Sequence, residues 1–583
     1  MISMTFCIPR RKYISRIRSV AFAILALWFF SIGLFYVLPT NYPNEFSKDS
    51  SQGSSDTAHI IQRIDSLFAE LKVLKINNME MKKILGNANP EGAAALAAAS
   101  LAANAKDWSF GLNDVRSAGE PLEAYEKTRR SLEYDLKELW YNIRSRQGNL
   151  DENDLAQMQD VYRTLRSHLI KLRAADGYEA FREQETAELA TLVQDRLHVL
   201  QNPKHCDTAK KLVCNLNKGC GFGCQVHHVC YCLVVAYATG RTLILESRGW
   251  RYNRQGWEQI FLPVSDTCTF SGTSKRDDFA SGKTEDSRVV QLPIVDFLKP
   301  KPDYLPISIP ADIADRLEKV HGEPHIWWVG QFMKFLLRLQ PQFQNIIDSH
   351  VSKLGVSSPT VGIHVRRTDK IGTEASLHSL KEYMVHAEEY FSIMEKVHGQ
   401  VKRRVFIASD EPSVIAEAMN SYPRPEWEIL GDAKVAQSAS MGQRYNGAGL
   451  VGILKDVFVL AECDFVVCTF SSQVCRLAYE LIQAKHTDAS ERFVSLDDVY
   501  YYGGGNGLVQ VATAPHKPRN DEEIELKVGD KIGVAGNHWN GMSKGTNQRT
   551  HRKGLYPSYK ARNLIQRVSF PKVKWWLQAA AAD

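Results

Sequence analysis

The sequence lacks three short motifs that each carry a specific chemistry. No Asp-x-Asp occurs in its 583 residues, so the carboxylate pair that commonly holds a metal-bound nucleotide sugar is missing. No Gly-x-x-x-x-Gly-Lys-Ser/Thr loop occurs either, which argues against a P-loop NTPase. There is also no Asn-x-Ser/Thr acceptor, so the chain itself carries no N-glycan. The absence of the first two motifs leaves room for a nucleotide diphosphate that is held by arginines rather than by a metal.

The sequence also has little net charge. The formal charge is +6, and no basic stripe is interleaved with aromatic residues, so binding to nucleic acid is disfavoured. With 44% hydrophobic and 24% charged residues the composition is that of a globular protein. The length leaves room for two or three domains.

Charge is absent altogether from residues 20–38. This stretch is long enough to span a bilayer, and it follows the basic residues Arg10, Arg11, Lys12, Arg16 and Arg18. Basic residues on the amino side favour a cytoplasmic N-terminus. A cleaved signal peptide would have a shorter apolar region and a small-residue cleavage site. We therefore expect a retained signal anchor, with a cytoplasmic tail at 1–19, a polar stem at 39–57 and a luminal body.

The eleven cysteines fall mainly into two clusters, at residues 206–268 and 463–475. The Cys-x-x-x-Cys glycine loop at 220–224 could bind zinc, but beyond a membrane anchor it is more readily a disulfide in an oxidising lumen. The first cluster has seven cysteines, so at least one of them stays unpaired.

Residues 58–200 have the spacing of coiled-coil helices. Apolar residues recur at alternating three- and four-residue steps in two stretches: Ile60, Ile64, Leu67, Leu71 and Leu74, then Leu155, Met158, Tyr162, Leu165, Leu169 and Leu172. Two explanations are open. The stripes either pack on the chain's own globular body or join two copies of the chain as a homodimer.

From residue 206 to 500 short β-branched segments alternate with helical patterns. Residues 242–245, 361–365, 404–408 and 464–468 are predicted as buried parallel strands, with helices at 380–397 and 452–461 among the segments between them. This alternation predicts a doubly wound α/β region.

The last part, residues 505–566, resembles an SH3 domain. A Gly-Asp turn at 529–530, a Trp-Asn-Gly segment at 539–541 and a Gly-Leu-Tyr-Pro-Ser segment at 554–558 occur in the order of that family. Where SH3 domains usually carry Ala-Leu-Tyr-Asp-Tyr, this chain has Ala-Thr-Ala-Pro-His at 512–516. Two of the rings that would hold a proline-rich peptide are therefore missing, which makes such binding doubtful.

A group of charges follows the strand at 361–365. Ligands of open α/β sheets bind at the carboxyl ends of strands, and the fork of an arginine suits a diphosphate, so Arg366 and Arg367 are candidates for that contact. Lys370 could neutralise a leaving phosphate, and Glu374 could take a proton from an attacking hydroxyl. The alternative is a loop of solvated charges that closes a core strand.

Polar residues also follow the later strands. Asp410 comes after the strand at 404–408, and the hydroxyls at 469–472 come after the strand at 464–468, where a helix start suits phosphate oxygens. Asp456 could accept a hydrogen bond from a guanine or a ribose, or be an ordinary surface residue of its helix.

Four features together resemble one known family. They are the runs HVRRTDKIGTE at 364–374, CTFSSQVC at 468–475 and SLDDVYY at 495–501, and the terminal SH3 domain. They resemble the α-1,6-fucosyltransferases that fucosylate the core of N-glycans (glycosyltransferase family 23), and the resemblance extends from the signal anchor to the SH3 domain.

This resemblance implies a single-pass type II membrane enzyme of the Golgi with a GT-B-like fold and a catalytic domain at 206–500. The enzyme would transfer fucose from GDP-β-L-fucose to O6 of the innermost, Asn-linked GlcNAc of glycoproteins that expose a GlcNAc. Inversion to an α linkage would need no metal and no other cofactor. Two alternatives are a GDP-sugar transferase that acts on other hydroxyls and a glycan-binding scaffold. An intact set of Arg366, Lys370 and Glu374 counts against the scaffold.

The resemblance also implies roles for individual residues. Glu374 would be the base and Lys370 would assist the leaving phosphate, with Asp369 and Arg366 completing the catalytic set. The donor would contact Arg366, Arg367, His364, Asp369, Tyr383, Asp410, Asp456, Ser472 and Gln473, and the acceptor would contact Asp296 and His538. The implied disulfides are Cys206–Cys268, Cys214–Cys232, Cys220–Cys224 and Cys468–Cys475.

The chain departs from the family pattern at a few positions. Phe222 stands where the family often has Tyr, and Glu411 replaces an Asp. Cys230 and Cys463 are extra cysteines, which we expect to be free thiols.

Overall fold

The computed structural model describes residues 119–279, 286–294, 298–368, 376–440 and 442–570. They belong to one compact unit, residues 116–583. The predicted anchor, stem and first heptad stretch lie outside these ranges. Within them, no helix has both the length and the apolar character needed to cross a membrane.

Three long helices precede the first strand: α4 (Glu123–Ser145), α5 (Glu152–Ala175) and α6 (Glu179–Gln201). The side chain of Asp151 caps α5 by accepting a hydrogen bond from the Asn153 N–H, which satisfies one of the helix's open donors. A short 3₁₀ turn, η2 (Gln147–Asn149), connects α4 to α5, and the two helices contact each other.

The second predicted heptad stretch lies on α5, and its residues divide between two environments. Tyr162 is buried and stacks on Trp140 of α4, with ring centroids 5.1 Å apart. Met158, Leu165 and Leu172 are exposed on the surface of the unit, by 39% to 49%. The first explanation therefore holds for Tyr162, which packs on the chain itself, whereas a homodimer contact through the exposed residues stays a prediction.

The first sheet has four parallel strands in the order β2-β1-β4-β3. They are β1 (Lys211–Asn215), β2 (Thr242–Glu246), β3 (Asp277–Asp278) and β4 (Val289–Gln291). Helix α7 (Phe222–Thr239) is almost wholly buried beside β1 and β2, and its last turn is closed by Gly240 at φ 60°. Helices α8 (Ala311–Val320), α9 (Pro324–Leu336) and α10 (Pro341–Leu354) lead from this sheet to the next.

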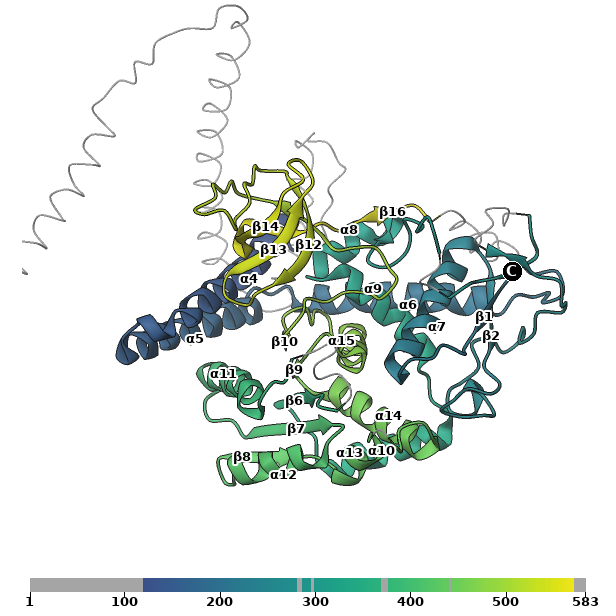
Figure 1. The fold of residues 1–583 in the computed structure, drawn as a ribbon, viewed down its shortest axis with the longest axis horizontal. Helices are drawn as coiled ribbons and strands as arrows, with labels where there is room; N and C mark the ends of the chain where they lie inside the picture. Colours follow the sequence, from purple (N-terminus) through teal and green to yellow (C-terminus); the bar gives the residue numbers. More distant parts are fainter. Residues whose placement is uncertain (1–118, 280–285, 295–297, 369–375, 441, 571–583) are drawn as a thin grey trace, which may run out of the picture. The chain divides into compact units, whose positions relative to one another are not determined.

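The second sheet has five parallel strands in the order β10-β9-β6-β7-β8 (Figure 1). They are β6 (Thr360–Val365), β7 (Arg403–Ser409), β8 (Trp427–Leu430), β9 (Phe465–Cys468) and β10 (Phe493–Ser495). All four strands predicted from the sequence are present, one in the first sheet and three in this one.

Helices cover both faces of the second sheet. On one face Val405 and Ile407 share a core with α11 (Leu380–His398) and α12 (Pro412–Ser421). On the other face Phe406 and Ala408 share a core with α14 (Gly447–Glu462) and α15 (Gln473–Lys485). Successive side chains of a strand point to opposite faces, so the apolar residues of β7 are buried on both sides, as a doubly wound sheet requires. The helix predicted at 452–461 begins earlier, because Asn446 caps α14 at its N-terminus.

The C-terminal domain is an antiparallel sheet in the order β14-β13-β12-β11-β15. Its elements are β11 (Val509–Ala512), β12 (Lys531–Asn537), β13 (Met542–Asn547), β14 (Lys553–Pro557), the 3₁₀ turn η6 (Ser558–Lys560) and β15 (Ala561–Asn563). Asp530 fixes the predicted turn by accepting a hydrogen bond from the Lys527 N–H at 2.9 Å. The chain then returns to the catalytic part, where β16 (Arg567–Val568) pairs with β5 (Ile309–Pro310).

Helix α4 packs directly on this SH3 domain. Tyr141 makes an edge contact with Trp539, and the Asn537 side chain donates a hydrogen bond to Glu138 at 3.0 Å. The Tyr134 hydroxyl donates to the Ser558 carbonyl at 3.4 Å. Trp539 belongs to the Trp-Asn-Gly segment of the SH3 pattern. The side of the domain that carries Trp539 is therefore in contact with helix α4 of the same chain.

All four disulfides implied by the resemblance are present among the described residues: Cys206–Cys268, Cys214–Cys232, Cys220–Cys224 and Cys468–Cys475. Cys230 and Cys463 are free and buried, as expected. Burial raises the pKa of both thiols, which keeps them protonated and unreactive.

Candidate functional site

The candidate site begins where β6 and β7 end side by side. The two strands are paired in register as far as Val365 and Ser409, so Arg366 and Asp410 follow at the same edge of the sheet. Their side chains form an ion pair between Arg366 Nη1 and Asp410 Oδ2. The predicted arginine and a predicted aspartate, 44 residues apart in the sequence, are thus brought together.

Asp410 holds the start of the following loop in place. Its carboxylate accepts hydrogen bonds from the backbone N–H of Arg367 at 2.9 Å and of Thr368 at 3.2 Å, and from the Thr368 hydroxyl. Burial alone would raise the pKa of Asp410, but the Arg366 charge and these hydrogen bonds hold it below its ordinary value. Asp410 is therefore an ionised anchor for the backbone around Arg366.

Arg367 points to a different partner. Its guanidinium forms an ion pair with Glu417 of α12 at 3.2 Å, while only its N–H reaches Asp410. The structure thus places the Arg367 guanidinium against α12, and a contact between Arg367 and the donor stays a prediction.

His364 and Tyr383 lie near this strand end. His364 is 6% exposed, and burial together with the Arg366 charge lowers its pKa to about 4, so the imidazole is neutral. Its Nδ1 is buried without a hydrogen-bond partner among the described residues, which leaves one ring nitrogen for a ligand. Burial also raises the pKa of Tyr383, whose hydroxyl bonds to Thr469 at the end of β9.

Ser472 and Gln473 form the start of α15, directly after β9. Ser472 is the N-cap residue and is buried. The lobe built on the first sheet packs against the lobe built on the second sheet at this point. A Cβ on Gly223 of α7 would lie only 2.9 Å from the Gln473 backbone. Only glycine permits this close approach, and the neighbouring Phe222 makes an edge contact with Tyr252 at 5.9 Å.

Asp456 lies on α14, half-buried, with Asp410 close enough to influence its charge. Burial, and after it the charge of Asp432, raises the pKa of Asp456 well above its ordinary value. Asp456 is thus partly buried near other carboxylates, and its contact with the donor stays a prediction.

Sequence reasoning missed several residues that the fold brings to the same place. Arg444 donates a hydrogen bond from Nη2 to the Thr368 hydroxyl at 3.0 Å, which links it to Asp410. Beside it, Tyr445 receives the Arg251 guanidinium on its ring face at 3.4 Å and contacts Tyr252 at 5.5 Å. Residues 444–445 do not directly follow a strand, because α13 (Ala433–Ser438) lies between them and β8, so the strand-end rule that identified Arg366 and Asp410 gave no signal for them.

The SH3 domain reaches the same region through one loop. Asp497 accepts a hydrogen bond from the Ser471 N–H at 3.4 Å, and its carbonyl accepts one from Trp539 Nε1 at 2.9 Å. His538, the residue before Trp539, is exposed on this loop. The structure therefore ties the loop of His538 to the chain segment that precedes Ser472, although the two are far apart in sequence.

Four predicted residues lie outside the described ranges: Asp369, Lys370, Glu374 and Asp296. Their roles stay predictions. Thr368, the last residue described before Asp369, is fixed to Asp410.

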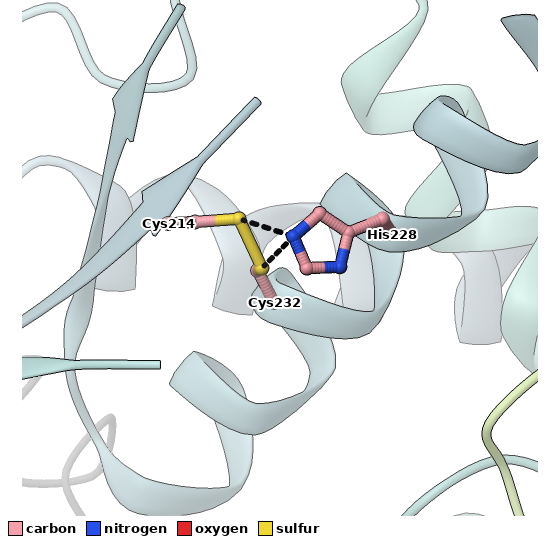
Figure 2. Close-up of side chains that lie close together, drawn as sticks. All are labelled: Cys214, His228 and Cys232. Carbon is pink, nitrogen blue, oxygen red and sulfur yellow. Dashed lines mark hydrogen bonds between the residues drawn. A yellow bond between two sulfur atoms is a disulfide. The ribbon is translucent and has the colours of Figure 1, made fainter. Parts of the chain in front are cut away.

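One group of side chains among the described residues has the composition of a metal site: Cys214 of β1 with His228 and Cys232 of α7 (Figure 2). The two sulfurs are joined in a disulfide, and His228 Nε2 lies 3.8 and 3.9 Å from them. Thiolates are what zinc requires from cysteine, and a disulfide offers none. The arrangement is a buried disulfide with an imidazole against it.

Two α/β lobes, each built on a parallel sheet, with a basic group and a helix N-terminus at the carboxyl ends of the second sheet, define a two-lobed, GT-B-like nucleotide-sugar transferase fold. The family described as "Alpha-(1,6)-fucosyltransferase N- and catalytic domains" matches residues 10–501. The chain belongs to this family.

Curated relatives agree with this assignment. A Drosophila melanogaster alpha-(1,6)-fucosyltransferase is 48% identical over 468 residues, which cover 78% of this chain and 75% of the relative. A Caenorhabditis elegans alpha-(1,6)-fucosyltransferase is 40% identical over 452 residues, covering 76% and 80%. The fucosyltransferase NodZ from Bradyrhizobium, a solved structure, aligns with 47% of this chain and 93% of its own at 14% identity and a TM-score of 0.29. That likeness is too weak to bear on the site.

Proposed function

We propose that this protein transfers fucose from GDP-β-L-fucose to O6 of the innermost, Asn-linked GlcNAc of N-glycoproteins. The observation that carries the proposal is the Arg366–Asp410 pair at the carboxyl ends of β6 and β7, in a chain of the alpha-(1,6)-fucosyltransferase family. The pair presents a guanidinium fork whose backbone is fixed, which suits a diphosphate.

The donor's diphosphate would lie against Arg366, at the point where Ser472 begins α15. Backbone N–H groups at a helix start add hydrogen bonds to phosphate oxygens. His364, with its open ring nitrogen, and Tyr383 and Gln473 complete this surface. Asp456 would accept hydrogen bonds from the guanine, and contact with that base would favour its ionised form.

The chemical step would be a single displacement. Glu374 takes the proton of the acceptor O6–H, and the oxygen forms a bond to C1 of fucose. The bond from C1 to the β-phosphate oxygen breaks, and its electron pair leaves with GDP. Attack from the face opposite the phosphate turns the β-linked donor into an α-linked product. Arg366 and Lys370 neutralise the charge that develops on the phosphate, so the step needs no metal.

The acceptor glycan would approach from the SH3 side, where the loop of His538 is held by Asp497. Asp296 would supply a second contact to the acceptor. The Trp539 side of the SH3 domain is already in contact with helix α4. The role that we propose for the domain is therefore recognition of the glycan.

The proposal includes the setting of the enzyme. Residues 20–38 would anchor it in the Golgi membrane as a single-pass type II protein with the catalytic domain in the lumen. Exposed apolar residues of α5, Met158, Val161, Leu165 and Leu172, would form the contact of a homodimer.

The test is an assay of the protein with GDP-fucose and a biantennary glycopeptide that exposes terminal GlcNAc, with and without EDTA. We expect an α1,6-fucosylated product in both conditions. If no such product forms, the proposed reaction is wrong. If product forms only without EDTA, the metal-independent mechanism is wrong.

A pair of matched substitutions tests the site. Arg366→Lys keeps the charge but loses the fork, so turnover should fall by at least about a hundredfold. Arg403→Lys makes the same change at the opposite, amino end of β7, where Arg403 forms a two-bond pair with Glu395 at 3.0 Å. It should leave turnover unchanged. Equal losses in both variants would mean that the arginine pair only stabilises the sheet.

A further inference from the structure

A loop of the first lobe reaches the second lobe beside the candidate site. The loop, residues 247–257, follows the carboxyl end of β2. Trp250 and Tyr252 are buried, and the Trp250 indole donates a hydrogen bond to Gln225 of α7. Arg251, between these two rings in the sequence, is exposed. The loop is therefore anchored on its own lobe and presents Arg251 at the surface.

Tyr445 of the second lobe contacts this loop. The Arg251 guanidinium lies over the Tyr445 ring, 3.4 Å from its centroid, and the Tyr252 ring lies 5.5 Å from it. A guanidinium over the face of an aromatic ring is attracted by the ring's electron density. We call these three side chains the interlobe contact.

Arg444, the residue before Tyr445, connects the interlobe contact to the candidate site. Its Nη2 donates a hydrogen bond to the Thr368 hydroxyl at 3.0 Å. That hydroxyl donates to Asp410, which also pairs with Arg366. The contacts therefore run without a break from the first lobe to the Asp410–Arg366 pair of the second.

The chain restrains Arg444 and Tyr445 together. Both precede Asn446, whose side chain caps α14 by accepting a hydrogen bond from the Gly449 N–H at 2.8 Å. The cap fixes the backbone on the carboxyl side of Tyr445, and the interlobe contact fixes its ring. Neighbouring residues cannot move independently, so a Tyr445 ring that is held in place also restrains the Arg444 guanidinium on Thr368.

The interlobe contact lies outside the hydrophobic core. Arg251 is exposed, and 39% of the Tyr445 side chain is exposed as well. A cation over a ring at an exposed position stabilises the folded state only slightly. Arg444, by contrast, is only 6% exposed beside the candidate site. Losing the interlobe contact should therefore affect the site more than the stability of the fold.

From these contacts we propose that Arg251 and Tyr445 are positioning residues of the donor site. Their contact holds Arg444 on Thr368, and this keeps Arg366 in the arrangement that binds the donor's diphosphate. The inference rests on the proposed function, because it takes Arg366 as the residue that binds the diphosphate. When only a fraction of the molecules has the binding arrangement, the apparent affinity falls by that fraction.

The test is calorimetric titration of the full chain and its variants with GDP. Arg251→Gln removes the cation and should weaken GDP binding by about threefold, the size of an exposed cation–π contact. Tyr445→Leu removes the ring from both Arg251 and Tyr252 and should weaken GDP binding by about tenfold. Tyr445→Phe keeps the ring and should bind GDP as tightly as the wild type.

Arg254→Gln is the matched control, because Arg254 is an exposed arginine of the same loop. It should leave GDP affinity unchanged. In a Tyr445→Leu background, Arg251→Gln should cause no further loss, because the ring under the guanidinium is already gone. Additive losses in this double variant would overturn the proposal. So would a Tyr445→Leu variant with wild-type GDP affinity, or an equal loss in Arg254→Gln.

Thermal unfolding of the same preparations separates positioning from a structural role. All variants should unfold close to the wild-type temperature. An Arg251→Gln variant that unfolds at a lower temperature but keeps wild-type GDP affinity would show that the contact only stabilises the fold, and the proposal would be wrong.

GDP binding requires no transfer of fucose, so the inference and the proposed function fail in different ways. If the wild type binds GDP but forms no fucosylated product, the proposed reaction is wrong, and the variants still decide on the interlobe contact. If the wild type forms product and all variants bind GDP equally, the reaction stands and the positioning role is wrong.

Discussion

Substituting Asp410 by Asn tests the candidate site most directly. The change removes one charge and leaves the shape of the side chain nearly intact. It therefore isolates the contribution of the carboxylate charge to stability and to activity. In the native structure that carboxylate faces the Arg366 guanidinium, two N–H groups and the Thr368 hydroxyl. An amide keeps one acceptor oxygen and turns an NH₂ toward some of these donors, which cannot bond to it.

The expected loss of stability follows from burial. Breaking a buried ion pair costs about 3–5 kcal/mol when the remaining charge stays buried. The Arg366 side chain is 17% exposed and can reach water, so about 2–3 kcal/mol is the better expectation for Asp410→Asn. The catalytic loss should be larger, at least about a hundredfold in kcat/KM, because the loop that begins at Thr368 loses its anchor.

The assay compares kcat/KM for GDP-fucose with thermal unfolding of the same preparation. Asp464→Asn is the matched control. Asp464 accepts hydrogen bonds from the Thr360 N–H at 2.8 Å and from Ser358, at the amino end of β6. The Asp464→Asn substitution should lower the stability of the protein and leave the activity of the folded enzyme intact. A folded Asp410→Asn enzyme within threefold of wild-type kcat/KM would refute our account of the site.

Three further predictions concern other parts of the molecule. Because the pKa of Asp456 is raised, GDP affinity measured by calorimetry should fall as pH decreases, beginning at a higher pH than an ordinary aspartate would cause, and Asp456→Asn should remove that dependence. Burial raises the pKa of Glu323 to about 7, so the folded state binds an extra proton between the ordinary pKa of a glutamate and pH 7, and the wild-type unfolding temperature should fall as pH rises from 5 to 7. Glu323→Gln should flatten this trend; an unchanged slope contradicts it. Leu165→Glu should convert a dimer to monomers in sedimentation, whereas Arg146→Gln should not. If the wild-type protein itself sediments as a monomer, the proposed dimer contact is wrong.

Much of the fold followed from local patterns. The strands β2, β6, β7 and β9 were predicted because runs of β-branched residues buried on both faces leave a continuous apolar signature. The boundaries were less certain, and α14 starts at Gly447 because the Asn446 side chain caps it, a contact that an apolar pattern does not reveal. The disulfide pairs followed from resemblance, because spacing alone leaves several pairings open.

The candidate site was only partly predictable. Arg366 and Asp410 follow apolar strands, where ligands of parallel sheets bind, and this rule identified both. Arg444 and Tyr252 follow no such rule. They reach the site because the loop before α14 and a loop of the first lobe meet in space, which depends on packing between distant segments.

By itself the sequence determined the α/β and SH3 composition of this protein, its family, and the residue types that can hold a diphosphate. These depend on periodicity and on side-chain chemistry, both of which are local. Only the tertiary structure decided that Asp410 fixes the backbone next to Arg366, that Trp539 ties the SH3 loop to Asp497, and that Tyr141 of α4 packs on Trp539. Each of these contacts joins residues tens to hundreds of positions apart, and their partners are selected by strand register and helix packing, which no local pattern encodes.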